Sequence, residues 1–259
     1  DDLLFFSTKG KVYQTKMYEI PESSRTAKGK SVVNFLALSQ EEEITSVVSL
    51  SKKQKKAADS SLVMVTKKGI IKKTSIDYFS DVRRSGIIAI ALQKGDTLNW
   101  ARIIDKKDTV MLFTKKGLAI RFKESDIRNM LRSARGVKAI NLKSGDELVD
   151  CEIIGQDLKD AEILVVSKNG FGKKSRVKEF KIQKRGGTGI KAMAVSQKTG
   201  NLVNASIITE EKEEFIIVSK KGKTLRTKIK EIPLLGRATQ GVRIMKLESI
   251  DSIASMTLI

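Results

Sequence analysis

One phrase returns five times along this chain: an apolar run, a Ser or Thr, two residues that are mostly Lys, and a Gly. The copies read LLFFSTKG, LVMVTKKG, VMLFTKKG, ILVVSKNG and FIIVSKKG, and they end at Gly10, Gly69, Gly117, Gly170 and Gly222. The intervals between these glycines are 59, 48, 53 and 52 residues. A period of about 50 residues is typical of one supersecondary unit that is repeated along the chain.

Three further positions keep the same register. Nine residues after the Gly there is an acidic residue, and a large apolar residue follows it directly. In the second copy this pair lies one residue earlier. The five pairs are Glu19-Ile20, Asp77-Tyr78, Asp126-Ile127, Glu179-Phe180 and Glu231-Ile232. An Arg follows in every copy at fifteen residues, and then a second glycine: Gly29, Gly86, Gly136, Gly189 and Gly241. We expect Tyr78 to lie in the core. The acidic residues recur once per repeat, so we expect them to pair locally with basic groups or to cap the following loop.

The apolar runs of each repeat are too short for helices and predict four strands. The run before the Gly is the first strand, and the Lys-Gly step is a hairpin signal. The second strand alternates, which predicts a half-exposed basic face that includes Lys16, Arg121 and Lys123. Two more runs follow, one after the second glycine and one before the next repeat. Helix has little support, although residues 124–131 could form one short turn.

The sequence therefore predicts an all-β, propeller-like single domain over residues 1–259, with one four-stranded antiparallel blade per repeat. The repeats span approximately 1–58, 59–106, 107–158, 159–210 and 211–259. The low-complexity stretch 51–60 is expected to be a solvated loop, and the tail 251–259 one more strand.

Composition limits the function. The chain has 50 Lys and Arg against 30 Asp and Glu, a net charge of +20, which favours a polyanionic partner, nucleic acid first and an anionic membrane surface second. It has no His, which excludes His-dependent catalysis, and no metal or phosphate-loop motif, so no cofactor is expected. Its single Cys151 is expected to be a buried hydrophobe, consistent with a reducing cytoplasm. No apolar stretch reaches the ~18 residues of a membrane span, so no membrane-spanning segment is expected. Between the two polyanions, duplex DNA and not a membrane is the expected partner.

The loops that carry the repeated Arg are the candidate site. Each joins strands at the same place in its repeat, so the basic loops should form a rim that holds duplex DNA by its phosphates. Few aromatics argue against stacking of single-stranded bases. An alternative is that these are solvated turn charges of a scaffold that binds acidic proteins. The candidate residues are Arg25, Lys28, Lys30, Arg83, Arg84, Arg132, Arg135, Lys138, Lys184, Arg185, Lys191, Arg237 and Arg243.

Three segments carry a family resemblance: LLFFSTKGKVYQTKMYEIPESSRTAKGKSVVNFL (3–36), VMLFTKKGLAIRFKESDIR (110–128) and GRATQGVRIM (236–245). On these the chain resembles the C-terminal domain of the A subunit of bacterial DNA gyrase, whose fold is called a β-pinwheel. The resemblance implies a non-catalytic domain that bends and wraps duplex DNA of any sequence and so supports negative supercoiling. It implies an A2B2 holoenzyme that contains the N-terminal part of the A subunit, together with the B subunit, where the catalytic tyrosine, ATP and Mg²⁺ lie outside this chain. It also implies a cytoplasmic protein and a monomeric isolated domain.

One feature departs from the family's pattern. Its hallmark heptad, Gln-Arg-Arg-Gly-Gly-Lys-Gly, lies in the first of six expected blades, and five repeats are visible here. We expect the first blade to lie upstream of residue 1 or to be missing. The nearest match keeps five of seven positions and is interpreted as the equivalent loop of a later blade: Gln183, Lys184, Arg185, Gly186, Gly187, Thr188 and Gly189. A second interpretation is the corresponding domain of topoisomerase IV, which has the same fold, selects DNA crossings and lacks an intact heptad.

Overall fold

The structure is a computed structural model that describes residues 1–24, 26–51, 54 and 60–259. The predicted loop 51–60 therefore lies largely outside the described residues, as does Arg25. The chain divides into two compact units. The first unit comprises Asp1–Lys106 and Ile127–Val137, and the second comprises Lys107–Asp126 and Lys138–Ile259.

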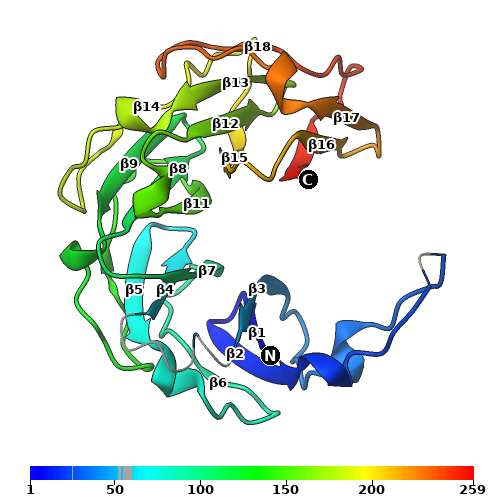
Figure 1. Cartoon of the computed structure of the whole chain (residues 1–259), viewed down its shortest axis with the longest axis vertical. Helices are drawn as coiled ribbons and strands as arrows, with labels where there is room; N and C mark the ends of the chain where they lie inside the picture. Colours follow the sequence, from blue (N-terminus) through cyan, green and yellow to red (C-terminus); the bar gives the residue numbers. More distant parts are fainter. Residues whose placement is uncertain (25, 52–53, 55–59) are drawn as a thin grey trace. The chain divides into compact units, whose positions relative to one another are not determined.

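The first unit is built on two antiparallel sheets (Figure 1). One has the order β3-β1-β2-β6, with bounds Ile44–Leu50, Asp2–Ser7, Lys11–Lys16 and Ile87–Ile88. The other has the order β10-β5-β4-β7, with bounds Val137–Lys138, Ile70–Ser75, Ser61–Thr66 and Leu98–Ile104.

The second unit contains three sheets. The order β11-β8-β9-β14 has bounds Leu148–Ile154, Thr109–Thr114, Leu118–Lys123 and Ile190–Lys191. The order β15-β12-β13-β18 has bounds Leu202–Ile208, Glu162–Ser167, Phe171–Arg176 and Val242–Arg243. The order β17-β16-β19 has bounds Thr224–Lys228, Glu214–Ser219 and Ile253–Leu258.

Short 3-10 turns connect these strands: η1 (Met17–Glu19), η2 (Val32–Asn34), η3 (Ile76–Phe79), η4 (Glu124–Asp126), η5 (Gln156–Leu158), η6 (Val177–Glu179) and η7 (Ile229–Glu231). The all-β prediction and the four-stranded antiparallel sheets are thus confirmed, and the tail forms the predicted strand β19. The turn expected at 124–131 is the short η4. Within the described residues, no helix has the length and apolar character needed to cross a membrane.

The prediction that each repeat forms its own sheet was wrong. The short strand after the second glycine pairs with the second strand of the preceding repeat: β6 with β2, β10 with β5, β14 with β9 and β18 with β13. Figure 1 labels β14 beside β9 and β18 beside β13 in the second unit. A complete sheet therefore takes three strands from one repeat and one from the next. The sheet that holds β17 has three strands.

The first repeat also differs from its predicted form. Its expected third strand, SVVNFL (31–36), contains the 3-10 turn η2. Leu36 is buried, and it packs with Leu3, Phe5 and Tyr13 of the first repeat's own sheet. The segment that pairs with a preceding sheet in later repeats therefore packs here on its own sheet.

The turn glycines Gly10, Gly117 and Gly170 receive the strand that crosses over from the next repeat. The N–H groups of Ala192 and Met193 donate to the carbonyl oxygen of Gly117 at 2.8 and 3.1 Å. Gly117 has a φ of 79°, and a Cβ added to it would lie 2.5 Å from the carbonyl oxygen of Met193. Gly222 occupies the same repeat position with a φ of 84°, and no atom lies within 4 Å of its would-be Cβ. Gly117 is therefore required twice, for its backbone conformation and for the close approach of the next repeat.

The Lys before the turn glycine belongs to the scaffold. The N–H of Lys116 donates to Asp146 Oδ1 at 3.0 Å, and its Nζ donates to the carbonyl oxygen of Ser144 at 2.5 Å. Lys68 with Asp96 and Lys221 with Asp251 repeat the main-chain contact at 2.9 and 3.2 Å. These bonds fasten the hairpin turn to the turn before the fourth strand, so the repeated Lys is explained without a ligand.

The core contains Cys151, which is fully buried as predicted. Tyr78 is 46 % exposed, so its predicted place in the core was wrong. Phe79 is fully buried instead and packs edge-on against Phe6 with ring centroids 6.2 Å apart. Phe79 lies ten residues after Gly69, the offset at which Ile127 and Phe180 are also buried. The buried position of the second repeat therefore keeps the common spacing, and only its acidic residue, Asp77, is displaced by one.

Replacing the turn glycine tests the crossover. We expect Gly222→Ala to cost about 1 kcal/mol, because an L-residue is strained at positive φ. Gly117→Ala should cost about 2 kcal/mol more, because the new Cβ would overlap the Met193 carbonyl. Urea denaturation followed by circular dichroism measures both. Equal losses would mean that the crossing strand does not depend on this close approach.

Candidate nucleic-acid interface

The Arg loops of the third, fourth and fifth repeats are fastened at both ends to the preceding sheet. At its start, each loop donates an N–H to the second strand of that sheet: Met130 to Lys73 O (2.8 Å), Gln183 to Arg121 O (2.7 Å) and Leu235 to Lys174 O (2.8 Å). At its end, each loop continues into the short crossover strand. The loop therefore arches over one edge of the preceding sheet, and its two held ends fix the backbone positions from which its side chains extend.

The second glycine lets the loop lie directly on that sheet. Gly189 has a φ of 75°, and a Cβ on it would lie 2.6 Å from the carbonyl oxygen of Ala119. Gly136 approaches the carbonyl oxygen of Ile71 in the same way, also at 2.6 Å. Only glycine meets both demands, positive φ and contact with backbone.

Nine of the predicted basic residues are exposed: Lys28, Lys30, Arg83, Arg84, Arg135, Lys138, Lys184, Lys191 and Arg243. Three are half-buried: Arg132, Arg185 and Arg237. The first unit holds Lys28, Lys30, Arg83, Arg84, Arg132 and Arg135, and the second holds Lys138, Lys184, Arg185, Lys191, Arg237 and Arg243. Each unit thus carries six candidate cations on its loops and crossover strands.

In the second unit, the repeated Arg ties one loop to the previous one. Arg185 donates through Nη1 to the carbonyl oxygen of Lys138 at 3.0 Å and through Nε to that of Asp126 at 2.9 Å. Arg237 donates through Nη1 to the carbonyl oxygen of Lys191 at 3.0 Å. Basic residues of consecutive repeats are therefore brought together. Arg185 and Arg237 anchor the loops, and the exposed Lys138, Lys184 and Lys191 are free to meet a ligand.

The repeated acidic residues contact the Arg loop of the next repeat. Glu179 Oε2 accepts the N–H of Arg237 at 2.9 Å, and Glu19 Oε1 lies 3.9 Å from Arg84 Nη2. The side chain of Arg84 is 88 % exposed, so this ion pair is weak. We predicted that the acidic residues pair locally with basic groups. In these two contacts the basic partner lies in the following repeat. In the described part of the chain, no group of three or more His, Cys, Asp or Glu could hold a metal ion.

The profile of one protein family, described as "DNA gyrase C-terminal domain, beta-propeller", matches residues 1–51, 60–105, 108–154, 161–209 and 213–259. This chain belongs to that family. The match consists of five segments that together span most of the sequence, which is the coverage expected of a domain built from repeats.

Individual relatives agree with the gyrase family. The DNA gyrase A subunit of Haloquadratum walsbyi is 39 % identical over 257 residues, which are 99 % of this chain and 30 % of that protein. A solved structure of a DNA gyrase A C-terminal domain superposes with a TM-score of 0.82 at 28 % identity, covering 100 % of this chain and 82 % of that one. A solved structure of the C-terminal domain of DNA topoisomerase IV superposes with a TM-score of 0.89 at 23 % identity. The superposition covers 100 % of this chain and 79 % of that one, so the two share the fold. The chain spans less than a third of its curated gyrase relative.

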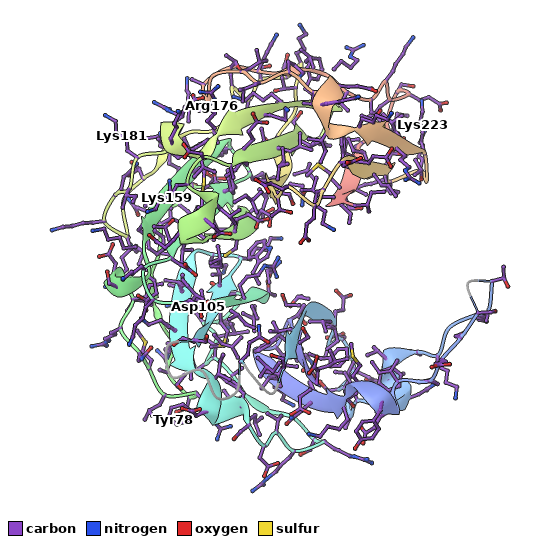
Figure 2. The ribbon with its side chains drawn as sticks, in the orientation of Figure 1. Tyr78, Asp105, Lys159, Arg176, Lys181 and Lys223 are labelled. Atoms are coloured by element: carbon purple, nitrogen blue, oxygen red, sulfur yellow. The ribbon has the colours of Figure 1, made fainter. Side chains whose placement is uncertain are left out.

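In this gyrase-family chain, the heptad-like loop is a tightly held Arg loop. The N–H of Gly186 donates to the carbonyl oxygen of Ala139 at 2.6 Å, and the carbonyl oxygen of Gly187 accepts from Asn141 at 2.8 Å. Gly186 has a φ of 82°. The two glycines let the backbone turn closely over the preceding repeat, while Lys184 and Thr188 stay exposed. Lys181, labelled in Figure 2, is a further exposed cation just before this loop.

Arg243 differs from the other candidates because an aromatic ring holds it. Its guanidinium carbon lies 5.2 Å from the ring centroid of Phe171, and Lys198 Nζ lies 5.6 Å from the same centroid. Phe171 is buried, so both cations cover one edge of β13. Arg243 is exposed, but its position is set by this cation–π contact.

The half-exposed basic face predicted for the second strands was wrong at Arg121, whereas Lys16 is half-buried and Lys123 is exposed, as predicted. Lys72 and Lys173 are fully buried, and Arg121 is 8 % exposed. Arg121 donates through Nε to Thr109 Oγ1 at 2.9 Å and through Nη1 to the carbonyl oxygen of Val177 at 3.4 Å. The physical reason is the crossover, because the Arg loop of the next repeat covers these strands. The sequence signal for this burial is that Lys72 and Lys173 lie three residues after the turn glycine, where the other repeats have Tyr13, Ile120 and Leu225.

Burial changes the ionisation of these groups. It lowers the pKa of Lys72 to about 8, and the positive charge of Arg132 acts in the same direction. It also lowers the pKa of Lys173 to about 8, where Glu179 opposes the shift and Arg237 adds to it. Both lysines are therefore mainly protonated at pH 7. Burial likewise lowers the pKa of Arg121.

The two roles within the heptad-like loop predict different mutant behaviour. Arg185→Gln removes two contacts to main-chain carbonyls and should lower the free energy of unfolding by about 1 kcal/mol, a value reduced for its partial exposure. Lys184→Gln, the matched control, should change it by less than about 0.5 kcal/mol. Thermal denaturation of the two variants checks this, and equal melting temperatures would contradict the anchoring role.

Proposed function

We propose that this chain is the DNA-binding C-terminal domain of a DNA gyrase A subunit, and that it binds duplex DNA by its phosphates along the Arg loops. The observation that carries the proposal is the linkage of consecutive loops in the second unit. Arg185 reaches the carbonyl of Lys138, and Arg237 reaches that of Lys191, so exposed cations of neighbouring repeats lie next to each other.

Such an arrangement suits a phosphate backbone. Each Lys or Arg that neutralises a phosphate releases condensed counterions, and this release supplies affinity independent of base sequence. Cations held on successive rigid sheets favour a duplex that follows them, and the additional phosphate contacts offset the energy needed to bend it. Main-chain N–H groups of the loops are further donors for the phosphate oxygens.

The family membership extends the proposal to the holoenzyme. The chain covers 30 % of the gyrase relative's length, so catalysis is assigned to the remainder of such a protein. In this proposal the catalytic tyrosine lies there, ATP and Mg²⁺ are used elsewhere in an A2B2 complex with the gyrase B subunit, and the domain itself needs no cofactor. Wrapping of DNA by this domain would then support negative supercoiling in the cytoplasm.

Selective charge removal tests the phosphate contacts. Neutralising Arg135, Lys138, Lys184 and Lys191 to Gln should weaken binding to a duplex of about 30 base pairs by more than tenfold. The magnitude of the slope of log K against log salt should fall by about 3.6, since each of the four contacts contributes roughly 0.9. Fluorescence anisotropy across a potassium chloride series measures both quantities.

The matched control neutralises Lys94, Lys143, Lys212 and Lys246, four exposed lysines outside the Arg loops. This variant loses the same net charge and should keep most of the affinity and slope. Equal losses in the two variants would favour a diffuse charge field. Binding by the unaltered chain without salt dependence would overturn phosphate recognition.

A topology assay tests wrapping. Nicked circular DNA ligated with the chain bound should show a change in linking number that grows with protein concentration. Binding with no such change would limit the domain to bending. A chain that fails to bind duplex DNA but captures acidic proteins would instead support the scaffold interpretation.

A further inference from the structure

The third residue after each of the first four turn glycines lies beneath the Arg loop of the next repeat. Tyr13 Cε1 lies 2.5 Å from the would-be Cβ of Gly86, and Ile120 Cδ1 lies 3.6 Å from that of Gly187. Lys72 and Lys173 hold the equivalent positions in the second and fourth repeats. One position thus supports four successive loops with an aromatic ring, an ammonium, an aliphatic chain and a second ammonium.

Lys72 is surrounded by main-chain carbonyls. Its Nζ donates to the carbonyl oxygens of Leu131 (3.0 Å) and Ala134 (3.4 Å), and also to those of Arg132 and Ala89. All of these residues belong to the first unit. A fully buried ammonium needs such acceptors, because burying a charge without partners is costly. Its presence therefore holds three carbonyls of the loop 131–134 turned inward.

The inward direction of these carbonyls determines which main-chain N–H groups lie on the outer face of the loop. In a trans peptide, the C=O of one residue points opposite to the N–H of the next. The chain has no cis peptide bonds among its described residues. With the carbonyls of Leu131, Arg132 and Ala134 directed at Lys72, the N–H groups of Arg132, Ser133 and Arg135 point away from it. The loop therefore presents three main-chain donors beside two Arg side chains.

The equivalent loop of the fifth repeat already holds an oxyanion in this way. Lys173 Nζ donates to the carbonyl oxygen of Gly236 at 2.6 Å, and the next N–H, that of Arg237, donates to the carboxylate of Glu179 at 2.9 Å. Arg132 occupies the same place in the third repeat as Arg237 in the fifth. The repeat position of Glu179 is taken by Tyr78 in the second repeat. The acidic residue of that repeat, Asp77, lies one place earlier, and its carboxylate accepts from the Ser75 hydroxyl at 3.0 Å.

From this geometry we propose that the N–H groups of Arg132, Ser133 and Arg135 form a main-chain binding site for one phosphate group of duplex DNA, and that Lys72 is its positioning residue. The site rests on the proposed DNA binding and names one of its phosphate contacts. Main-chain donors clustered on a turn bind oxyanions well, and neighbouring Arg side chains strengthen the contact. Lys72 lies behind the loop and does not touch the ligand.

Nuclear magnetic resonance of the full chain, labelled with ¹⁵N, tests the site directly. Adding duplex DNA should shift the amide resonances of residues 132, 133 and 135, and 10 mM inorganic phosphate should shift the same amides to a smaller extent. A shift with inorganic phosphate but none with DNA would overturn DNA as the source of the phosphate. No shift with either probe would overturn the site.

Lys72→Met tests the positioning role. It should abolish the DNA-induced shifts at 132, 133 and 135 and weaken duplex binding by about five- to tenfold, while amides 183–187 respond as before. Lys123→Met, an exposed lysine on the equivalent strand of the third repeat, is the matched control and should leave the shifts at 132, 133 and 135 unchanged. Retention of these shifts in a folded Lys72→Met variant would overturn the role of Lys72. If that variant does not fold, the unaltered chain still decides the site.

The two proposals fail in distinguishable ways. If amides 183–187 respond to DNA and those of 132, 133 and 135 do not, the chain binds DNA and the phosphate site is wrong. If no loop responds to DNA and no binding is measured, the proposed function itself fails.

Discussion

Two hydrogen bonds from the N–H groups of Ala192 and Met193 to the carbonyl of Gly117 join the fourth repeat to the sheet of the third. Equivalent bonds join Ala89 and Ile90 to Gly10, and Ile244 and Met245 to Gly170. A sheet is complete only when the next repeat donates its short strand. The turn glycines, the covered strand edges and the position of every Arg loop after the first depend on this exchange.

The exchange also fixes the position of the Arg loops. Since the crossover strand and the start of the Arg loop are both bonded to the preceding sheet, the loop is fixed at two points and arches between them. Arg185 and Arg237 then tie the loop to the carbonyls of the previous crossover strand. Rigid loops of this kind place exposed lysines without the entropy cost that a mobile loop would incur on binding.

Much of the architecture could be predicted from local pattern. The strand before each turn, the hairpin glycine, the buried Cys151 and the final strand follow from apolar runs and from the backbone freedom of glycine. The choice of Tyr78 over Phe79 for the core failed because it followed the acidic residue, which is displaced by one in this repeat, whereas the buried position keeps its distance from the turn glycine. The basic loops could be located from the sequence, but their division into anchors and free cations could not.

The sequence by itself determined that this chain is a repeated all-β protein with a basic loop in every repeat, because turns and strand periodicity are local properties. Only the tertiary structure decided which sheet receives each short strand. The pairing of an edge strand depends on backbone groups that every residue shares, so its partner leaves little trace in side-chain pattern. That non-local choice buries Lys72 and Lys173 and turns the carbonyls of the next loops inward.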